Sequence, residues 1–170
     1  MRQVTTFAFV LCSIILLSGC GSDETPTTSN SVKFNGSSFS VLSASILGVS
    51  IDGEGHAGIS FTNVTNSGIS KTLTIDIEYS GNGSVEGRYS YPQAAGDLYL
   101  DEFLTNYTEI DISGGGSEYF TQLEGGGNGT VTVQHHGGDN YSVTMDLVME
   151  DGSEFTGKYR GNFVVVFNDN

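Results

Sequence analysis

The sequence is poor in basic side chains, in cysteine and in proline, and it has no tryptophan. Its 170 residues carry 6 Lys and Arg against 20 Asp and Glu, a formal net charge of −14 at pH 7. This balance excludes a nucleic-acid binder, because such a protein needs a basic surface to displace counterions from phosphates. It also argues against docking of the folded surface on anionic lipid headgroups.

Both cysteines, Cys12 and Cys20, lie in the first twenty residues. Cys12 is part of an apolar run of eleven residues, Phe7 to Leu17, which follows the short basic start Met1-Arg2-Gln3. A membrane-spanning helix needs about twenty apolar residues, so this run is too short to span a bilayer. A basic start before a short apolar run is typical of a secretory signal.

The residues Leu17-Ser18-Gly19-Cys20 follow the apolar run directly and resemble the lipobox of bacterial lipoproteins. In that family the signal is removed before the cysteine, whose thiol then carries a diacylglycerol and whose amino group is acylated. The resemblance implies a signal peptide over residues 1–19 and a lipid on Cys20. It leaves the rest of the chain without a thiol for a disulfide, a zinc site or catalysis. The alternative is an ordinary secreted protein.

The residues after the lipobox predict the membrane in which the lipoprotein is anchored. Gly21 stands where an aspartate would retain a lipoprotein in the inner membrane, so the resemblance implies the outer membrane in a cell that has one. Ser22-Asp23-Glu24 is similar to a short acidic surface-export signal, or else is a solvated linker. Several acyl chains on one cysteine form a permanent anchor, since each buried methylene contributes roughly 0.8 kcal/mol.

The remaining chain divides into a tether and one domain. Residues 20–31 are polar and lack apolar periodicity, which predicts a flexible tether behind the lipidated cysteine. From residue 32 to 170, apolar and polar residues alternate in short runs that Gly, Asn, Asp and Ser separate, the pattern of an all-β domain. We expect strands over residues 32–35, 38–51, 59–64, 69–79, 85–91, 98–104, 117–123, 130–136, 140–149 and 154–167.

The expected architecture is a single antiparallel β-sandwich or a lipocalin-like barrel of about 8–10 strands. Asn35-Gly36 predicts a tight hairpin turn between the first two strands. The segment 96–112 has the least regular pattern and allows a short helical turn.

Two segments, Leu73–Tyr89 and Val143–Tyr159, align without gaps. Either two hairpins share the same local pattern, or a three-strand meander is duplicated. The alignment predicts a hairpin turn over residues 80–84, with Asp76 opposite Arg88 on the solvent face. In the second segment it places Asp146 opposite Lys158.

The sequence contains few candidates for a chemical site. Gly53–Gly58 matches G-x-G-x-x-G but leads into another strand, which predicts a hairpin turn rather than a phosphate site. His56, His135 and His136 do not show a metal-ligand spacing, and adjacent strand residues point to opposite faces, so no metal site is predicted. Acidic groups that offer oxygen ligands are either calcium sites or solvated turns: Asp52 and Glu54; Asp97, Asp101 and Glu102; Glu150, Asp151 and Glu154.

Catalytic motifs are also missing. The chain has no G-x-S-x-G elbow, P-loop or cysteine nucleophile, so we predict no catalytic residue and no cofactor. A glycosidase needs only two carboxylates at a suitable separation, so this class stays open. All eight tyrosines lie beyond residue 32, at positions typical of half-buried core edges; the alternative is a sugar or peptide surface. They are Tyr79, Tyr89, Tyr91, Tyr99, Tyr107, Tyr119, Tyr141 and Tyr159.

Three segments near the C-terminus, Gly129–Val133, Tyr141–Val143 and Asp151–Gly161, are similar to the ending of many uncharacterised small β-domain lipoproteins. That resemblance implies no activity. We therefore expect an outer-membrane lipoprotein, on the periplasmic or surface face, whose domain binds an unknown protein or glycan without catalysis. The alternatives are a lipocalin-like carrier of a small apolar ligand and a structural envelope component.

Overall fold

The computed structural model describes residues 28–51, 54–80, 84–114 and 116–169, and the regular structure in these residues consists of strands. The prediction of an all-β domain is confirmed. No helix within these ranges is long and apolar enough to cross a membrane. The strands are β1 (Ser29–Asn30), β2 (Lys33–Phe34), β3 (Ser37–Ser38), β4 (Ser43–Ile51), β5 (Glu54–Val64), β6 (Ile69–Ser80), β7 (Gly87–Tyr91), β8 (Leu98–Asp111), β9 (Ser117–Gln122), β10 (Asn128–His135), β11 (Asn140–Val148), β12 (Glu154–Asn162) and β13 (Val164–Asp169).

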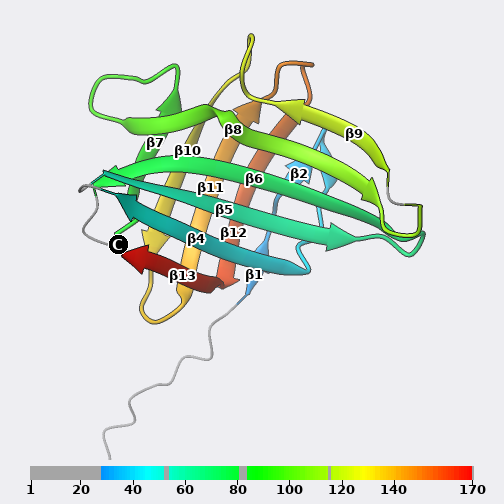
Figure 1. Ribbon diagram of the computed structural model, residues 1–170, viewed down its shortest axis with the longest axis horizontal. Coiled ribbons are helices and arrows are strands. Elements are labelled where there is room, and N and C mark those ends of the chain that lie inside the picture. The colour runs from blue at the N-terminus through cyan, green and yellow to red at the C-terminus, as the bar shows by residue number, and fades with distance from the viewer. Residues whose placement is uncertain (1–27, 52–53, 81–83, 115, 170) are drawn as a thin grey trace, which may run out of the picture.

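The strands join in one curled sheet that forms a half-barrel (Figure 1). Its order is β13-β4-β5-β6-β8-β7-β10-β11-β12-β2-β3, with β1 beside β12 and β9 beside β8. The half that contains β4, β5, β6, β8 and β13 crosses in front of the half that contains β7, β10, β11 and β12 (Figure 1). The pairs β13–β4 and β7–β8 are parallel, so the prediction of an antiparallel sheet is wrong at these two joints.

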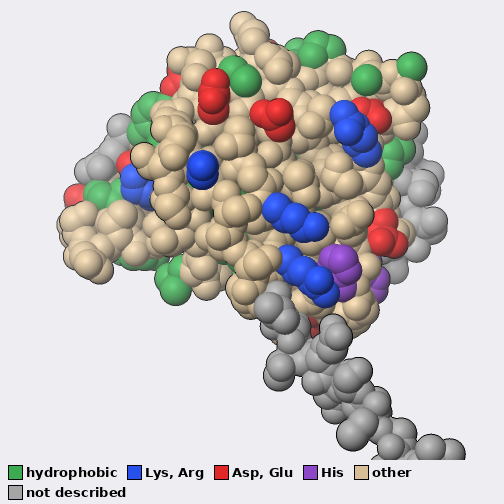
Figure 2. All heavy atoms as spheres, turned by 180° about the vertical axis from the view of Figure 1, so that it is seen from behind, with side chains coloured by type: hydrophobic (Ala, Val, Ile, Leu, Met, Phe, Trp, Pro, Cys, Tyr) green, Lys and Arg blue, Asp and Glu red, His purple; other side chains and the backbone are tan. Residues whose placement is uncertain are grey.

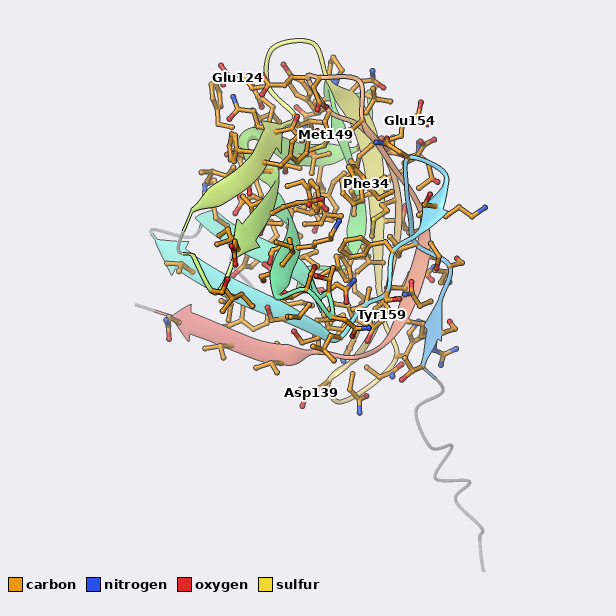
Figure 3. All side chains as sticks on the ribbon, turned by 90° about the vertical axis from the view of Figure 1, so that its right-hand side faces the viewer. Phe34, Glu124, Asp139, Met149, Glu154 and Tyr159 are labelled. Carbon is orange, nitrogen blue, oxygen red and sulfur yellow. The ribbon has the colours of Figure 1, made fainter. Side chains whose placement is uncertain are left out.

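Aromatic rings fill the space between the two halves (Figure 3). Phe61 of β5 packs against Tyr159 of β12 at 5.5 Å between ring centroids, and Tyr107 of β8 packs against Phe155 of β12 at 5.0 Å. The prediction of half-buried core edges is confirmed for Tyr91, Tyr99 and Tyr119, whereas the other five tyrosines lie deeper and are buried in the core. The buried five are Tyr79, Tyr89, Tyr107, Tyr141 and Tyr159.

Two predicted strands are broken where a phenylalanine turns into the core. The expected strand 154–167 is β12 followed by β13, and Phe163 between them is buried against Phe61 and Tyr159. Its N–H donates to the carbonyl oxygen of Asp139 at 2.9 Å. At this point the chain passes from β12, beside β11, to β13, at the edge of the sheet beside β4. The expected strand 38–51 is likewise interrupted after β3, where Phe39 is buried.

The hairpin predicted between residues 73 and 89 does not form. Strand β6 pairs with β5 and β8, whereas β7 pairs with β10 and β8, so Asp76 does not face Arg88. Arg88 instead pairs with Asp97, with 3.1 Å between Nε and Oδ2. The interposed β8 is the reason, because it takes the edge of β6 that the prediction gave to β7. The two similar segments therefore share local pattern without sharing a meander.

The second predicted hairpin forms with a different register. Strands β11 and β12 pair, but Asp146 faces Thr156 and Lys158 faces Thr144, a shift of two residues from the prediction. The turn closes with the N–H of Met149 donating to the carbonyl oxygen of Ser153, which fixes this register. Because the shift is even, each side chain stays on its predicted face of the sheet.

The N-terminal segment is held by β12. Asn35 and Gly36 have φ angles of 49° and 75°, which confirms the tight turn predicted there. Strand β1 lies within the residues expected to form the tether, and Ser29 faces Arg160. Gly157 has a φ of +116°, and a Cβ there would stand 2.2 Å from the carbonyl oxygen of Ser31, so only glycine fits beneath this segment. Residues 29–31, which the sequence assigned to the flexible tether, are therefore bound to β12 instead.

The packing of Phe61 generates a prediction. Phe61→Ala removes a fully buried ring from between two others and should lower the free energy of unfolding by about 3–5 kcal/mol. Urea unfolding followed by circular dichroism measures this loss. Thr144→Ala, at an exposed position of β11, is the control and should change stability by less than about 0.5 kcal/mol. Equal losses in the two variants would contradict the assignment of Phe61 to the core.

Candidate functional site

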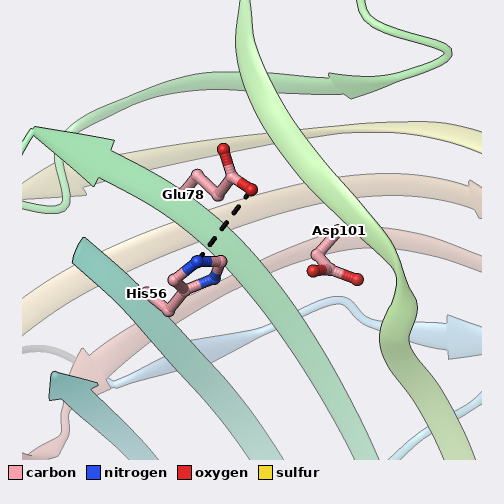
Figure 4. Close-up of side chains that lie close together, drawn as sticks. All are labelled: His56, Glu78 and Asp101. Carbon is pink, nitrogen blue, oxygen red and sulfur yellow. Dashed lines mark ion pairs between the residues drawn. The ribbon is translucent and has the colours of Figure 1, made fainter. Parts of the chain in front are cut away.

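Three potential metal ligands meet on the outer face of the front half of the sheet. His56 lies on β5, Glu78 on β6 and Asp101 on β8 (Figure 4). His56 faces Glu78 across the β5–β6 pair, and Asp76 faces Asp101 across the β6–β8 pair. Because side chains alternate between faces along a strand, Asp76 and Glu78 share this outer face with the other two. The ligand atoms of His56, Glu78 and Asp101 lie within 4.8 Å of one another.

The imidazole of His56 stands between two carboxylates. Its Nδ1 is 3.4 Å from Oδ1 of Asp76, and its Nε2 is 4.0 Å from Oε1 of Glu78. The side chain of Asp76 is only 13% exposed, whereas those of His56 and Glu78 are 48% and 47% exposed. The side chain of Asp76 is thus held in place by its neighbours, whereas the side chains of His56 and Glu78 can rotate.

The backbone around these carboxylates is irregular. The β6–β8 register shifts between Thr74 and Asp76, and the N–H of Asp76 donates to Oγ1 of the buried Thr105 at 3.0 Å. Oδ1 of Asp101 accepts hydrogen bonds from the N–H groups of Phe103 and Leu104, each at 2.9 Å. These contacts fix Asp76 and Asp101 at the bulge, on the face that carries His56.

Negative charge dominates this face. Burial raises the pKa of Asp76, the hydrogen bond with His56 lowers it, and the nearby carboxylates of Asp101 and Glu78 raise it again. In the described ranges, Asp76 and Glu78 form ion pairs with His56 when it is protonated, and Lys71 pairs with Glu109 elsewhere. Figure 2 shows that basic side chains gather on the opposite face of the molecule, over β2, β7 and β12. The basic residues of these strands are Lys33, Arg88, Lys158 and Arg160.

A cleft of about 280 Å³ adjoins the cluster. His56 and Glu78 line one side of it, and it opens to solvent. The Tyr99 hydroxyl donates to a carboxylate oxygen of Glu102, and this hydrogen bond, more than burial, raises the pKa of Tyr99. The other lining residues are Gly55, Tyr79, Gln93, Leu98 and Tyr99. The cleft therefore combines aromatic and aliphatic surface with two potential ligands.

The other two histidines lie away from this cluster. The ring of His135 stacks on Tyr141 at 4.6 Å between centroids, and its Nε2 is 2.7 Å from the carbonyl oxygen of Gly138. Nε2 of His136 is 3.0 Å from Oγ of Ser142. Both lie where β10 turns into β11, as expected from the sequence.

The glycine motif lies in a hairpin. Ile51 pairs with Glu54, so a hairpin joins β4 to β5, but the described residues of the motif, 54–58, belong to strand β5 rather than to its turn. Gly53 and Asp52 lie outside the described residues. His56 lies in this motif, and pairing across strands, rather than spacing along the chain, brings it to Glu78 and Asp101.

The acidic groups expected to offer oxygen ligands are largely engaged with protein atoms. Asp97 pairs with Arg88, and Glu102 accepts from Tyr99. Asp151 accepts from the hydroxyl of Tyr119, and from the N–H and the hydroxyl of Ser153 at 3.0 and 2.7 Å. Asp101 lies in the cluster with His56 and Glu78 rather than with Asp97 and Glu102.

No protein-family model, curated protein or solved structure matches this chain. Cys20, the residue expected to carry the lipid, lies outside the described residues.

The hydrogen bonds to Asp151 generate a prediction about pH. Burial raises the pKa of Asp151, but the bonds from Tyr119 and Ser153 outweigh it and bring the pKa down from 3.8 to about 2. The ionised carboxylate therefore stabilises the fold above pH 3.8, and this contribution disappears as the pH falls toward 2. Asp151→Asn should lower the thermal unfolding midpoint at pH 7, and its gap to the unaltered protein should narrow between pH 4 and pH 2.

Thermal unfolding followed by circular dichroism at several pH values measures this gap. Glu150→Gln, at the neighbouring exposed position, is the matched control for loss of one negative charge. A gap for Asp151→Asn that stays constant from pH 7 to pH 2 would contradict the assignment.

Proposed function

We propose that the protein is a lipid-anchored component of the outer membrane, attached through Cys20, whose β-domain binds a polypeptide partner without catalysis. Support for the anchor comes from the apolar run, the lipobox Leu17-Ser18-Gly19-Cys20 and the polar segment behind it. Multiple acyl chains hold such a protein on the membrane without help from its surface. The strongly acidic domain then stays free to meet a partner.

The packed interior favours binding on the outside of the domain. Phe61, Tyr89, Tyr107 and Phe155 are among the fully buried side chains that fill the space between the two halves. A carrier of the lipocalin type keeps its ligand within the barrel, so large rings in that position argue against this alternative. The surface is thus the place to search for a binding site.

The edge strand β13 carries the proposal. It is the terminal strand of the sheet order and pairs on one side with β4. Its sequence, VVVFND, begins with four apolar residues and has no Lys or Pro, the residues with which proteins block exposed edges. Val164 is 64% exposed, and Val166 lies level with Leu47 of β4, which is 53% exposed. Such an edge accepts an extended segment of another chain by strand addition.

The side chains beside this edge favour a polypeptide over a glycan. The large exposed side chains on β13 and β4 are aliphatic, namely Val164, Val166, Leu47 and Val49, and the small polar Ser43 and Asn168 are exposed nearer the strand ends. They can pack against alternate side chains of an added strand, whereas sugars are bound by aromatic faces and polar groups. We therefore name an extended peptide segment with apolar residues at alternate positions as the partner.

Site-specific crosslinking tests the proposed edge. With a photoreactive amino acid at Val164, irradiation of intact cells should give one major adduct of defined mass, and Val166→Lys in the same chain should reduce it at least fivefold. The same probe at Gln134, an exposed position on β10, is the control and should give no such adduct. Equal adducts from Val164 and Gln134, or an adduct that Val166→Lys leaves unchanged, would overturn the role of β13.

Metabolic labelling with a clickable palmitate analogue tests the anchor. Cys20→Ala should abolish the label and release the protein from the membrane fraction. Cys12→Ala, inside the expected signal peptide, is the matched control and should keep both. Labelling that survives Cys20→Ala would refute lipidation at this residue.

A further inference from the structure

We infer that His56, Glu78 and Asp101 bind one divalent transition-metal ion of the Zn²⁺ type on the outer face of the sheet. These residues come from three neighbouring strands, and their ligand atoms already lie within 4.8 Å of one another. The inference does not depend on the lipid anchor or on the edge strand β13.

The ligand types select the metal. One imidazole nitrogen and two carboxylate oxygens form a mixed set that suits Zn²⁺ and its neighbours in the first transition row. Ca²⁺ and Mg²⁺ prefer oxygen alone, and Ca²⁺ needs six to eight ligands at one point. The group in Figure 4 offers three residues, so a tetrahedral ion that keeps one position open matches it best.

The contact with Asp76 orients His56 for this task. Its carboxylate lies 3.4 Å from Nδ1, which favours the tautomer with the proton on Nδ1 and leaves the lone pair on Nε2. Nε2 lies 4.0 Å from Oε1 of Glu78, an ion pair when the imidazole is protonated. When the imidazole is neutral, a metal ion between these two atoms can replace the proton and bond to both. Asp76 is a positioning residue that acts through His56.

The distances need only a small adjustment. Bonds of about 2.0–2.2 Å to Zn²⁺ place two tetrahedral ligand atoms roughly 3.4 Å apart. The separations here, 4.0 Å for one pair and at most 4.8 Å for the others, are somewhat longer. The half-exposed side chains of His56 and Glu78 can close this difference by rotation, while the paired strands hold their backbones in place.

The carboxylate of Asp101 is held in place by backbone hydrogen bonds, across from His56 and Glu78. Its Oδ1 accepts from two backbone N–H groups, at Phe103 and Leu104, which fixes the carboxylate and leaves Oδ2 for the ion. The face also has a charge to neutralise, because three carboxylates surround one imidazole and the basic side chains of β2, β7 and β12 lie on the other face (Figure 2). A divalent ion offsets two of these charges.

The position that protein ligands leave open lies beside the cleft formed with Tyr79, Leu98 and Tyr99. A donor atom of a bound molecule can complete the coordination there while its apolar part contacts these side chains. The metal would thus add a second contact point to the domain, distant in sequence from β13.

Isothermal titration of the full-length chain, purified in detergent and stripped with EDTA, tests the site with ZnCl₂ as the probe. We expect one Zn²⁺ per chain, and CaCl₂ at tenfold excess should not displace it. His56→Ala should abolish this binding, Glu78→Gln should weaken it at least tenfold, and Asp76→Asn about tenfold through the loss of orientation. His136→Ala, at another surface histidine, is the matched control and should retain full binding.

Thermal unfolding separates loss of the site from loss of the fold. Zn²⁺ should raise the unfolding midpoint of the unaltered chain and of His136→Ala, because a ligand that binds only the folded state stabilises it. His56→Ala should unfold at the metal-free midpoint with or without Zn²⁺. Absence of Zn²⁺ binding, displacement by Ca²⁺, or binding that persists in both His56→Ala and Glu78→Gln would each overturn the proposal. Val166→Lys should leave Zn²⁺ binding unchanged, so the two proposals fail independently.

Discussion

The contact between aromatic rings across the two halves of the sheet is the interaction on which the rest of the structure depends. Phe61 and Tyr107 on the front half meet Tyr159 and Phe155 of β12 on the back half. A single sheet has two faces, and curling buries one of them without help from helices. The inner face is therefore filled by packing, which leaves the outer face and the edges of the sheet as its exposed surfaces.

Much of the strand content could be predicted from the sequence, because alternation of apolar and polar residues reports directly on a half-buried strand. The turn at Asn35-Gly36 was equally accessible, since those residues tolerate positive φ. The breaks at Phe39 and Phe163 were not, because a phenylalanine that turns into the core looks like one more apolar position in a strand. The insertion of β8 beside β6 depends on pairing between distant segments, which local periodicity does not report.

The candidate metal site could not be predicted from the sequence for the same reason. The β5–β6 hairpin alone brings His56 opposite Glu78, and a correct register for that pair would have predicted this contact. Asp101 joins them only because β8 runs along the other side of β6. In a sheet, ligands gather across strands rather than along them, so a search for spacing within one segment does not find the site.

The pairing of β1 and β2 with β12 also constrains the order in which the chain can fold. The N–H of Ser31 donates to the carbonyl oxygen of Lys158, 127 positions later in the chain, and β4 pairs with β13 at the C-terminal end. During synthesis the first strands to emerge wait without these partners until nearly the whole chain has been made. The strands β12 and β13, which span Glu154–Asp169, must therefore be made before the N-terminal strands can complete their pairing.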